Sequence, residues 1–193
     1  KISYCTGYTT MLDSLHFANR AELKINYSKK DEKFAIVSLH RFETISKKEN
    51  LWQVTQEIKK ISKKIKLLFI LHPPTRVSLI KNGLYKTLES EPGCVLLQRQ
   101  NFFQFHSLLT HAEFIITDGG SNQEESYYLG VPCLLFRNET ERSEGIGENV
   151  VISRFDSTII DNFVLNYNSY RKPTVSDTFS PSSFIVDQLK EYI

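Results

Sequence analysis

Short, continuously apolar segments alternate with segments of helical periodicity, and this alternation constrains the fold more than any other feature of the chain. The apolar segments predict strands at 33–39, 66–71, 94–98, 113–117, 132–136 and 149–152. Strands without a polar face are buried on both sides, which is typical of a parallel sheet covered by helices. The pattern therefore predicts an α/β fold with a Rossmann-like, doubly wound parallel sheet of about six strands.

The segments between these strands predict helices. Residues 49–65 carry apolar side chains at steps of three and four, the spacing of one helix face: Leu51, Val54, Ile58, Ile61 and Ile65. Further helices are predicted over 9–21, 102–112, 121–130 and 184–193, the third of them ending at Gly130. The segment 171–183 is rich in proline and hydroxyl side chains, and it predicts an ordered excursion without regular structure.

One more helix is predicted after the second strand. Pro73 and Pro74 follow that strand, and proline suits the first turn of a helix. The helix is expected to place Val77, Ile80 and Leu84 on its apolar face, with Gly83 weakening it.

Composition excludes several classes of protein. The net charge of +2 gives no argument for a nucleic-acid or membrane partner. The cysteines Cys5, Cys94 and Cys133 are odd in number and far apart, which predicts buried, reduced thiols in a cytoplasmic protein and no metal site. No apolar run approaches the ~18 residues of a membrane span, and the sequence given predicts no signal peptide. The chain begins with Lys1, so we expect it to be part of a longer protein.

The turn TDGGSNQEE, residues 117–125, follows the fourth predicted strand and is the leading candidate for a ligand site. Gly119 and Gly120 can take positive φ and let a ligand approach the backbone. The amides that open the next helix favour an anion such as a diphosphate, and Ser121 either adds a hydroxyl or caps that helix. Glu125 lies about one turn further on and suits the hydroxyls of a ribose. The competing interpretation is a tight turn with an ordinary cap.

Polar side chains follow other strands at the same edge of the sheet. His40, Arg41 and Glu43 come after the first strand, and His72 comes after the second. A histidine there either transfers protons or serves as a structural hydrogen-bonding group. Arg142, in the polar loop after the fifth strand, either holds a phosphate oxygen or belongs to a surface salt bridge.

These motifs, in this order, resemble the bacterial non-hydrolysing UDP-N-acetylglucosamine 2-epimerases. The family usually shows GHRxEN, TDSGGxQEE and TERPE, where this chain has LHRFET, TDGGSNQEE and TERSE. The opening TGYTTMLDSL resembles the family's TGNTxxDAL, at the junction of its two domains. The resemblance covers roughly residues 6–190. Leu39 stands in place of a glycine, Ser143 in place of a proline, and HPPT lacks the asparagine of HxNP.

The resemblance implies one half of a GT-B fold, the C-terminal domain that holds the nucleotide. It implies a hinge segment over 1–32 from an N-terminal domain, a UDP-binding domain over 33–183 and a C-terminal helix over 184–193. It implies His40 and Glu43 as catalytic residues and assigns UDP binding to Arg41, His72, Phe105, Gly119, Gly120, Ser121, Glu125 and Arg142. The implied partners are UDP or a UDP-N-acetylhexosamine and a second copy in a homodimer, with no cofactor.

The reaction implied by the resemblance eliminates UDP to give 2-acetamidoglucal and adds it back with inverted C2. The family's base and acid for C2 come from the N-terminal domain, so this chain alone is expected to bind UDP weakly and to catalyse nothing. The departures from the motifs leave alternatives open: a hydrolysing epimerase, a GT-B glycosyltransferase, or a non-catalytic module that binds a UDP-sugar.

Overall fold

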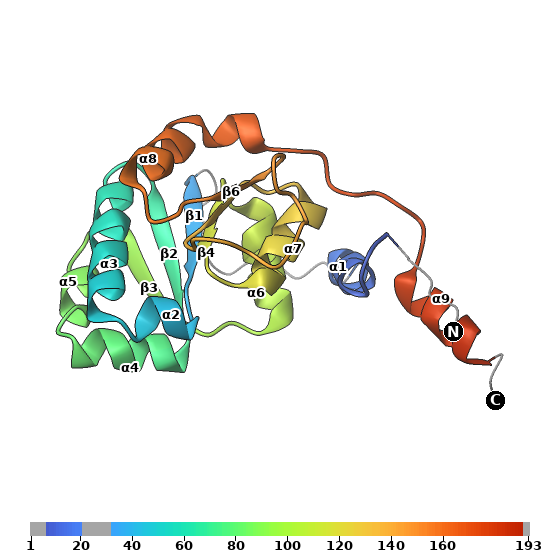
Figure 1. Ribbon diagram of the computed structural model, residues 1–193, viewed down its shortest axis with the longest axis horizontal. Coiled ribbons are helices and arrows are strands. Elements are labelled where there is room, and N and C mark those ends of the chain that lie inside the picture. The colour runs from blue at the N-terminus through green and yellow to red at the C-terminus, as the bar shows by residue number, and fades with distance from the viewer. Residues whose placement is uncertain (1–6, 21–31, 191–193) are drawn as a thin grey trace.

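Six parallel strands form one sheet in the order β3-β2-β1-β4-β5-β6 (Figure 1). The computed structural model describes residues 7–20 and 32–190. The strands are β1 Phe34–Ser38, β2 Lys66–Leu71, β3 Cys94–Gln98, β4 Ile115–Thr117, β5 Cys133–Leu135 and β6 Val150–Ile152. Each lies within a segment predicted as a strand, and the predicted fold class is confirmed.

The apolar character of the strands follows from their position in the sheet. β1 lies in the centre, where Val37 pairs with Phe69 of β2 and with Ile116 of β4, and all of its residues are buried. β3 pairs only with β2 and is partly exposed, as an edge strand is. Backbone groups in the water-free centre of the sheet must form hydrogen bonds with neighbouring strands. Because helices cover both faces there, the uniformly apolar segments become the inner strands.

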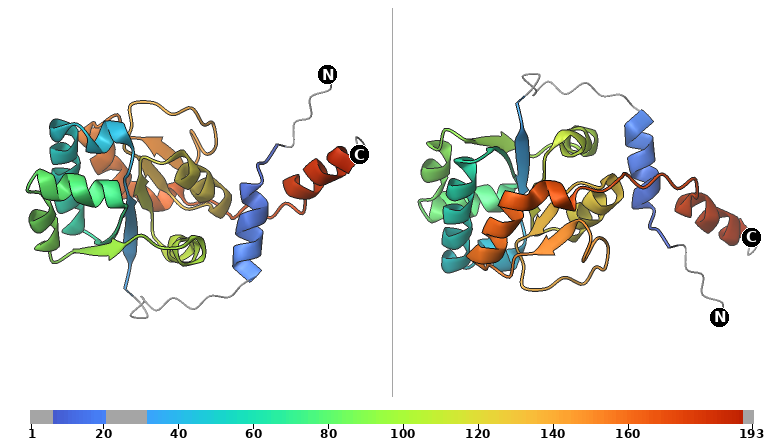
Figure 2. Two further views of the ribbon diagram at one scale, coloured as in Figure 1. Left: turned by 90° about the horizontal axis from the view of Figure 1, so that it is seen from below. Right: turned by 90° about the horizontal axis from the view of Figure 1, so that it is seen from above.

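Helices cover both faces of the sheet (Figures 1 and 2). One face packs against α3 Lys48–Ser62, α4 Pro73–Lys81, α5 Tyr85–Glu89 and α8 Ser157–Asn166. The other packs against α6 Phe102–His111 and α7 Gly120–Leu129, with α1 Met11–Arg20 beyond them. The remaining elements are α2 Phe42–Ile45, the 3₁₀ turn Tyr167–Tyr170 and α9 Pro181–Lys190.

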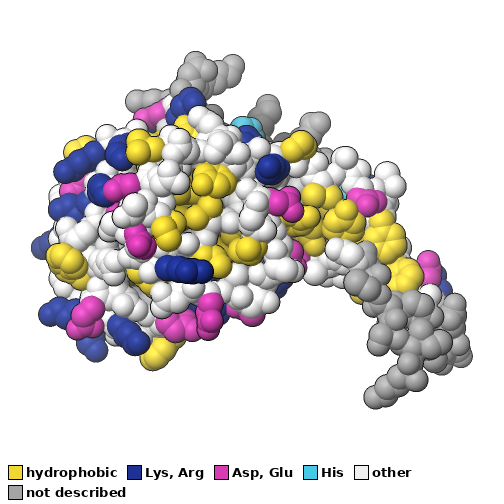
Figure 3. Space-filling view, turned by 45° about the horizontal axis from the view of Figure 1, so that its top comes forward, with side chains coloured by type: hydrophobic (Ala, Val, Ile, Leu, Met, Phe, Trp, Pro, Cys, Tyr) yellow, Lys and Arg dark blue, Asp and Glu magenta, His cyan; other side chains and the backbone are white. Residues whose placement is uncertain are grey.

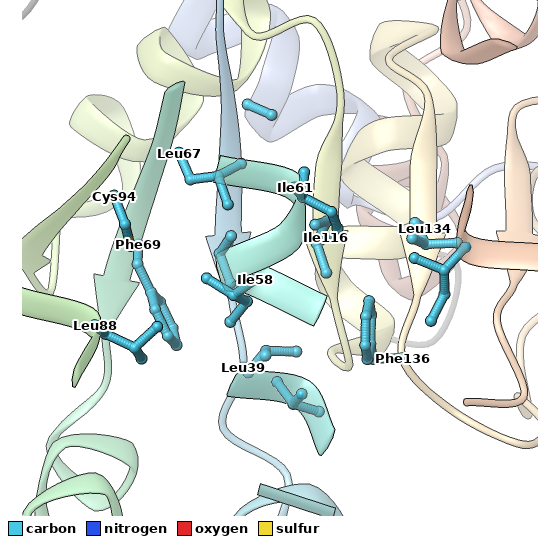
Figure 4. Packing of buried hydrophobic residues seen from close by; sticks show 14 of the residues in the cluster. Leu39, Ile58, Ile61, Leu67, Phe69, Leu88, Cys94, Ile116, Leu134 and Phe136 are labelled. Atoms are coloured by element: carbon cyan, nitrogen blue, oxygen red, sulfur yellow. The ribbon is translucent and has the colours of Figure 1, made fainter. Parts of the chain in front are cut away.

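The predicted apolar face of α3 is confirmed. Leu51, Val54, Ile58 and Ile61 are buried against the sheet, and Figure 4 shows Ile58 and Ile61 among the side chains of the strands. The helix ends at Ser62, before Ile65, which is only partly buried. Burying each of these aliphatic side chains contributes about 1.5–3 kcal/mol, so this helix anchors one face of the sheet.

The predicted helix after Pro73 is corrected in two ways. It stops at Lys81, and a second helix, α5, begins at Tyr85. Gly83 between them has φ +70°, which ends a helix at little steric cost. The predicted apolar face is also wrong, because Val77 and Ile80 are 64% and 55% exposed while Leu79 is buried.

Besides α5, two helices of the described residues, α2 and α8, have no counterpart in the sequence predictions. α8 follows β6, and the Asp156 side chain caps it by accepting hydrogen bonds from the backbone N–H groups of Thr158 and Ile159. Its buried side chains are Ile160, Phe163 and Val164. The four-residue α2 begins directly after Arg41 and turns the chain away from the carboxyl end of β1. A helix of four residues leaves no periodicity to read.

The first and last described helices project from the body that contains the sheet (Figures 1 and 2). The segment before α9 runs along the end of α7, where the N–H of Val175 donates to the carbonyl of Tyr128, in agreement with the predicted ordered excursion. Asp13 of α1 then accepts a hydrogen bond from the N–H of Ser182. Parts of the predicted hinge 1–32 and the end of the predicted helix 184–193 lie outside the described residues.

Two further sequence predictions concern cysteines and membrane spans. Cys94 and Cys133 are free and buried, as predicted, whereas Cys5 lies outside the described residues. Over residues 7–20 and 32–190, every helix is too short or too polar to cross a bilayer.

Candidate functional site

The carboxyl ends of β1 to β4 and the loop after β5 surround a cleft of about 470 Å³. The chain runs outward from β1 to β3 and returns to β4 on the other side of β1, so the strand order reverses here, and α/β sheets bind ligands at such a point. All but one of the predicted site residues line this cleft: His40, Arg41, His72, Phe105, Gly119, Gly120, Ser121, Glu125 and Arg142.

Glu43 is the predicted site residue that the structure places elsewhere. It lies in α2, is exposed, and lines a separate hollow of about 240 Å³ together with Lys47 and Asn50. The turn into α2 carries the chain away from the cleft after Arg41, so the structure does not bring Glu43 to the other site residues.

The glycine turn needs small residues because of its neighbours and not because of its backbone angles. Gly119 has φ −89° and is the N-cap of α7, and Gly120 is not among the positive-φ residues, so the prediction of positive φ is wrong. A Cβ on Gly119 would lie 2.8 Å from Cε1 of His40, and one on Gly120 would lie 2.8 Å from Nε of Arg142. Any side chain here would displace His40 or Arg142.

The start of α7 presents backbone donors to the cleft. The N–H of Gly119 donates to Oγ1 of Thr117 at 3.0 Å, and the N–H of Gln123 donates to the carbonyl of Gly119 at 3.1 Å. The N–H groups of Gly120, Ser121 and Asn122 lie before that first intrahelical bond and have no intrahelical acceptor. Together with the positive end of the helix dipole they form a site for an anion.

His40 is held by a buried carboxylate that the sequence analysis did not single out. Asp118 is fully buried, and its oxygens accept hydrogen bonds from the backbone N–H groups of His40 (2.9 and 3.1 Å) and Arg41 (2.9 Å). Its Oδ1 also lies 3.5 Å from Nδ1 of His40. The position of Asp118 directly after an apolar strand was the available signal, since strand-end carboxylates face the ligand side of such a sheet.

His72 packs against His40 on the floor of the cleft. Their rings are stacked, with centroids 4.5 Å apart, and Nε2 of His72 lies 3.5 Å from Oγ of Ser38. Burial, followed by electrostatic interaction with His40 and Arg99, lowers the pKa of His72 below its ordinary value. His72 is therefore neutral near pH 7 and can accept or donate a hydrogen bond there.

Glu125 is a buried carboxyl group at the wall of the cleft. Its Oε2 accepts a hydrogen bond from Nδ2 of Asn122 at 2.9 Å. Burial raises the pKa of Glu125 to about 7; the Asn122 hydrogen bond opposes this shift, and the charge of Glu124 adds to it. This group titrates within the physiological range, unlike an exposed glutamate.

The loop after β5 brings Arg142 over the glycine turn. Nη1 of Arg142 forms an ion pair with the buried Glu124 at 2.6 Å and lies 3.8 Å from Glu144. The side chain of Gln123 donates to the carbonyls of Arg142 and Glu144 and so ties the loop to α7. Arg142 thus belongs to a salt bridge, as one interpretation predicted, and it also lines the cleft, where its binding of a phosphate oxygen stays a prediction.

A second ion-pair cluster forms the outer rim of the cleft. Glu141 binds Arg41 and Arg137, each at 2.7 Å. A backbone hydrogen bond from its own N–H, followed by the bond from Arg137, lowers the pKa of Glu141 to about 2. Arg99, at the end of β3, lines the same cleft and was also missed from the sequence.

Aromatic side chains form one part of the lining of the cleft. Phe105 of α6 is half-buried and lines the cleft beside Phe102. Asn101 caps α6 in a capping box with Gln104, which fixes the start of this helix at the edge of the cleft. The cleft therefore combines backbone donors, arginines, a titrating carboxyl group and an aromatic surface.

Comparison with known proteins gives consistent matches. The model of the family described as UDP-N-acetylglucosamine 2-epimerase matches residues 4–176. A UDP-N-acetylglucosamine 2-epimerase of Methanococcus maripaludis is 37% identical over 122 residues, 62% of this chain and 33% of that protein. A homolog of that enzyme from the same organism is 31% identical over 161 residues, 80% of this chain and 44% of that protein.

Solved structures show the same likeness. The UDP-GlcNAc 2-epimerase of Methanocaldococcus jannaschii, in complex with UDP-GlcNAc and UDP, superposes with a TM-score of 0.79 at 26% identity, over 95% of this chain and 53% of that one. The enzyme of Neisseria meningitidis bound to UDP-GlcNAc shares the fold, with a TM-score of 0.76 at 23% identity over 94% of this chain and 54% of that one. The chain spans about half or less of the length of these relatives.

Proposed function

This chain belongs to the UDP-N-acetylglucosamine 2-epimerase family, and from this premise we propose that it is the UDP-binding, C-terminal half of an enzyme that interconverts UDP-N-acetylglucosamine and UDP-N-acetylmannosamine. One observation carries the proposal: the glycine turn, His40, Glu125 and Arg142 line a single cleft at the carboxyl ends of the strands. Motif positions spread over a hundred residues meet there, as a nucleotide site at a strand-order reversal requires.

In this proposal the diphosphate lies over the start of α7. The free N–H groups of Gly120, Ser121 and Asn122 donate to its oxygens, and Arg142 adds a charged donor. Glu124 already pairs with Arg142, so that side chain is oriented before the ligand arrives. Arg41 is held at the rim by Glu141, and His72 lies beneath His40.

The nucleoside part of UDP extends along the same helix in this assignment. Glu125 accepts hydrogen bonds from the ribose hydroxyls, since its carboxylate offers only acceptors. Phe105 stacks beside the uracil on the aromatic wall. The three parts of the cleft thus match phosphate, sugar and base in the order in which UDP presents them.

The reaction begins with elimination of UDP. A base removes the proton from C2, the C1–O bond breaks, the electron pair leaves with UDP, and 2-acetamidoglucal remains. His40, beside the glycine turn, stabilises the charge on the departing diphosphate. We assign the base to the part of the relatives' length that this chain does not span, because Glu141 is bound to two arginines and Glu125 is assigned here to the ribose hydroxyls.

We further propose that α1 and α9 form the junction with that second domain. Exposed apolar side chains lie on both helices, Phe17 on α1 and Ile185, Val186 and Leu189 on α9. Figure 3 shows hydrophobic side chains gathered on the projecting part of the molecule. Closure of a second domain over the cleft would exclude water from the reacting sugar. The buried free thiols of Cys94 and Cys133 support a reducing compartment such as the cytoplasm.

Calorimetric titration of this chain with UDP, UMP and uridine tests the nucleotide site. We expect affinity to fall stepwise as phosphates are removed, because each phosphate adds contacts at the start of α7. Glu125→Ala should weaken binding of UDP more than binding of inorganic phosphate, whereas Glu43→Gln, outside the cleft, should change neither. Equal affinity for UDP and uridine would contradict the placement of the diphosphate.

The activity itself is tested in a protein that contains both halves. Proton NMR of UDP-N-acetylglucosamine incubated with it should show UDP-N-acetylmannosamine accumulating to equilibrium. Release of free N-acetylmannosamine and UDP would identify a hydrolysing enzyme instead, and transfer of the sugar to an acceptor would identify a glycosyltransferase. An unchanged substrate alongside tight UDP binding would indicate a non-catalytic module.

A further inference from the structure

Four residues around the glycine turn form a continuous chain of hydrogen bonds. The N–H of Gly119 donates to Oγ1 of Thr117 at 3.0 Å. The hydroxyl of Thr117 donates to Oδ1 of Asn122 at 3.0 Å. The amide Nδ2 of Asn122 then donates to Oε2 of Glu125 at 2.9 Å. The backbone at the start of α7 is thereby connected to the carboxyl group at the wall of the cleft.

The chemistry of these groups gives the chain a direction. An ionised carboxylate has acceptors only, so Asn122 must present its NH₂ group to Glu125. Its carbonyl oxygen then faces Thr117 and needs a donor, which the hydroxyl supplies. Asn122 and Glu125 are three residues apart on α7, and side chains at that spacing lie on one helix face. Thr117 is fully buried at the end of β4 and provides a rigid support.

Glu125 depends on Asn122 for its orientation. The neighbouring Glu124 binds Arg142 and the hydroxyl of Thr9. Among residues 7–20 and 32–190, Asn122 is the one side chain that forms a hydrogen bond with Glu125. Asn122 also lines the cleft itself, so it lies between the diphosphate turn and the ribose carboxylate.

We propose that Asn122 is a positioning residue for ribose recognition: it holds the carboxylate of Glu125 toward the cleft and connects it to the diphosphate-binding turn. This inference rests on the proposed function. Its consequence is selectivity for ribonucleoside diphosphates over 2′-deoxyribonucleoside diphosphates, because a carboxylate held in place accepts hydrogen bonds from both ribose hydroxyls. A freely rotating carboxylate would first lose side-chain entropy to do so.

The titration midpoint of Glu125 distinguishes a positioning role of Asn122 from a purely structural one. A residue that only stabilised the turn would leave this midpoint unchanged. Two donating hydroxyls favour the ionised carboxylate, and so does the amide of Asn122, whereas burial and Glu124 favour the neutral form. The other charged or titratable side chains that line the cleft are Arg41, Arg99, Glu141, Arg142, His40 and His72. Removal of the Asn122 donor should therefore move the titration midpoint of Glu125 to higher pH.

The binding test compares Asn122→Ala with Asn50→Ala. Asn50 is a matched control because its amide also donates a hydrogen bond, to the carbonyl of Glu43, but outside the cleft. Calorimetry at pH 7 measures UDP, 2′-deoxyuridine diphosphate and pyrophosphate. We expect the wild type and Asn50→Ala to prefer UDP over its deoxy form by about tenfold, as a hydrogen bond to a charged group implies. In Asn122→Ala this preference should fall below ~twofold, with pyrophosphate unaffected.

The outcomes separate this inference from the function on which it rests. If the wild-type chain binds pyrophosphate as tightly as it binds UDP, the nucleotide site is overturned, and this inference with it. A wild type that prefers UDP, with the preference for ribose intact in Asn122→Ala, overturns this inference alone. A loss in Asn122→Ala that is equal for pyrophosphate and UDP also overturns it, since the residue would then only stabilise the turn.

A second measurement requires no ligand. Carbon NMR of labelled glutamate should show the Glu125 midpoint at higher pH in Asn122→Ala than in the wild type or Asn50→Ala. In the wild type, the side-chain amide signals of Asn122 should titrate with the same midpoint as Glu125, so the test holds even if the variant does not fold. If the side-chain amide signals of Asn122 do not change as Glu125 titrates, the inference is overturned.

Discussion

Replacing Glu125 by Gln should stabilise the fold at pH 8 and leave it nearly unchanged at pH 4. Glu125 is 7% exposed, and its burial disfavours the ionised form of the carboxyl group. Gln keeps the shape and still accepts the hydrogen bond from Asn122 through its carbonyl oxygen. It carries no charge at any pH, so the substitution removes the cost of a buried carboxylate and little else.

The sign and size of the effect follow from linkage between protonation and folding. The unfolded chain releases the proton of Glu125 near pH 4.5, and the folded chain releases it only at about pH 7. The stabilisation of the fold that comes from the raised pKa of Glu125 is therefore fully present below pH 4.5 and is lost as the pH rises through 7. A shift of this size corresponds to roughly 3 kcal/mol.

Urea unfolding measured from pH 4 to pH 8 tests this reasoning. The difference in unfolding free energy between Glu125→Gln and the wild type should be near zero at pH 4 and should grow to about 2–3 kcal/mol at pH 8. Glu43→Gln is the control, because Glu43 is exposed and its substitution should give a flat difference across the range. A flat profile for Glu125→Gln would refute the raised pKa of the buried Glu125 carboxyl group.

Three further substitutions probe the core, the turn and the reaction. Ile58→Ala should lower the free energy of unfolding by about 2–5 kcal/mol, since Ile58 is fully buried beneath the sheet, while the folded variant still binds UDP. A loss under ~1 kcal/mol, measured by urea unfolding, would contradict the core role of Ile58. Gly120→Ala should weaken UDP and pyrophosphate alike, by about tenfold in calorimetry, because its Cβ would displace Arg142; unchanged affinity would exclude that contact. In a protein with both halves, His40→Ala should lower turnover by ~100-fold and change UDP affinity by less than ~threefold; persisting turnover would make His40 structural.

The helix predictions show where pattern reading holds and where it stops. In α3 the apolar residues recur over four turns, and the predicted face is the buried one. After Pro73 the apolar residues Val77, Ile80 and Leu84 suggested one buried face, yet Val77 and Ile80 are exposed and Leu84 packs, partly buried, against the core. A glycine with positive φ divides that segment, and so few positions do not determine which side of a short helix meets the sheet.

The site predictions divide in the same way. The meeting of residues at strand ends, such as His40 and Gly119, in one cleft was predictable, because parallel strands bring their carboxyl ends to one edge of the sheet. Glu43 lies only three residues from His40, yet the short helix α2 carries it to another hollow. Asp118 belongs to the quoted motif, but its role depends on the backbone of a strand that is far away in sequence.

The amino-acid sequence by itself determined the fold class, the parallel sheet of apolar strands, the glycine turn and the edge of the sheet that carries the candidate site. These depend on local periodicity and on residue type, which every segment carries within itself. The tertiary structure alone decided that Asp118 holds His40, that Arg142 lies over Gly120, that Glu125 titrates near pH 7 and that Glu43 lies outside the cleft. Burial and distance between distant segments set these properties, because the energy of a charge depends on what surrounds it after the chain has folded.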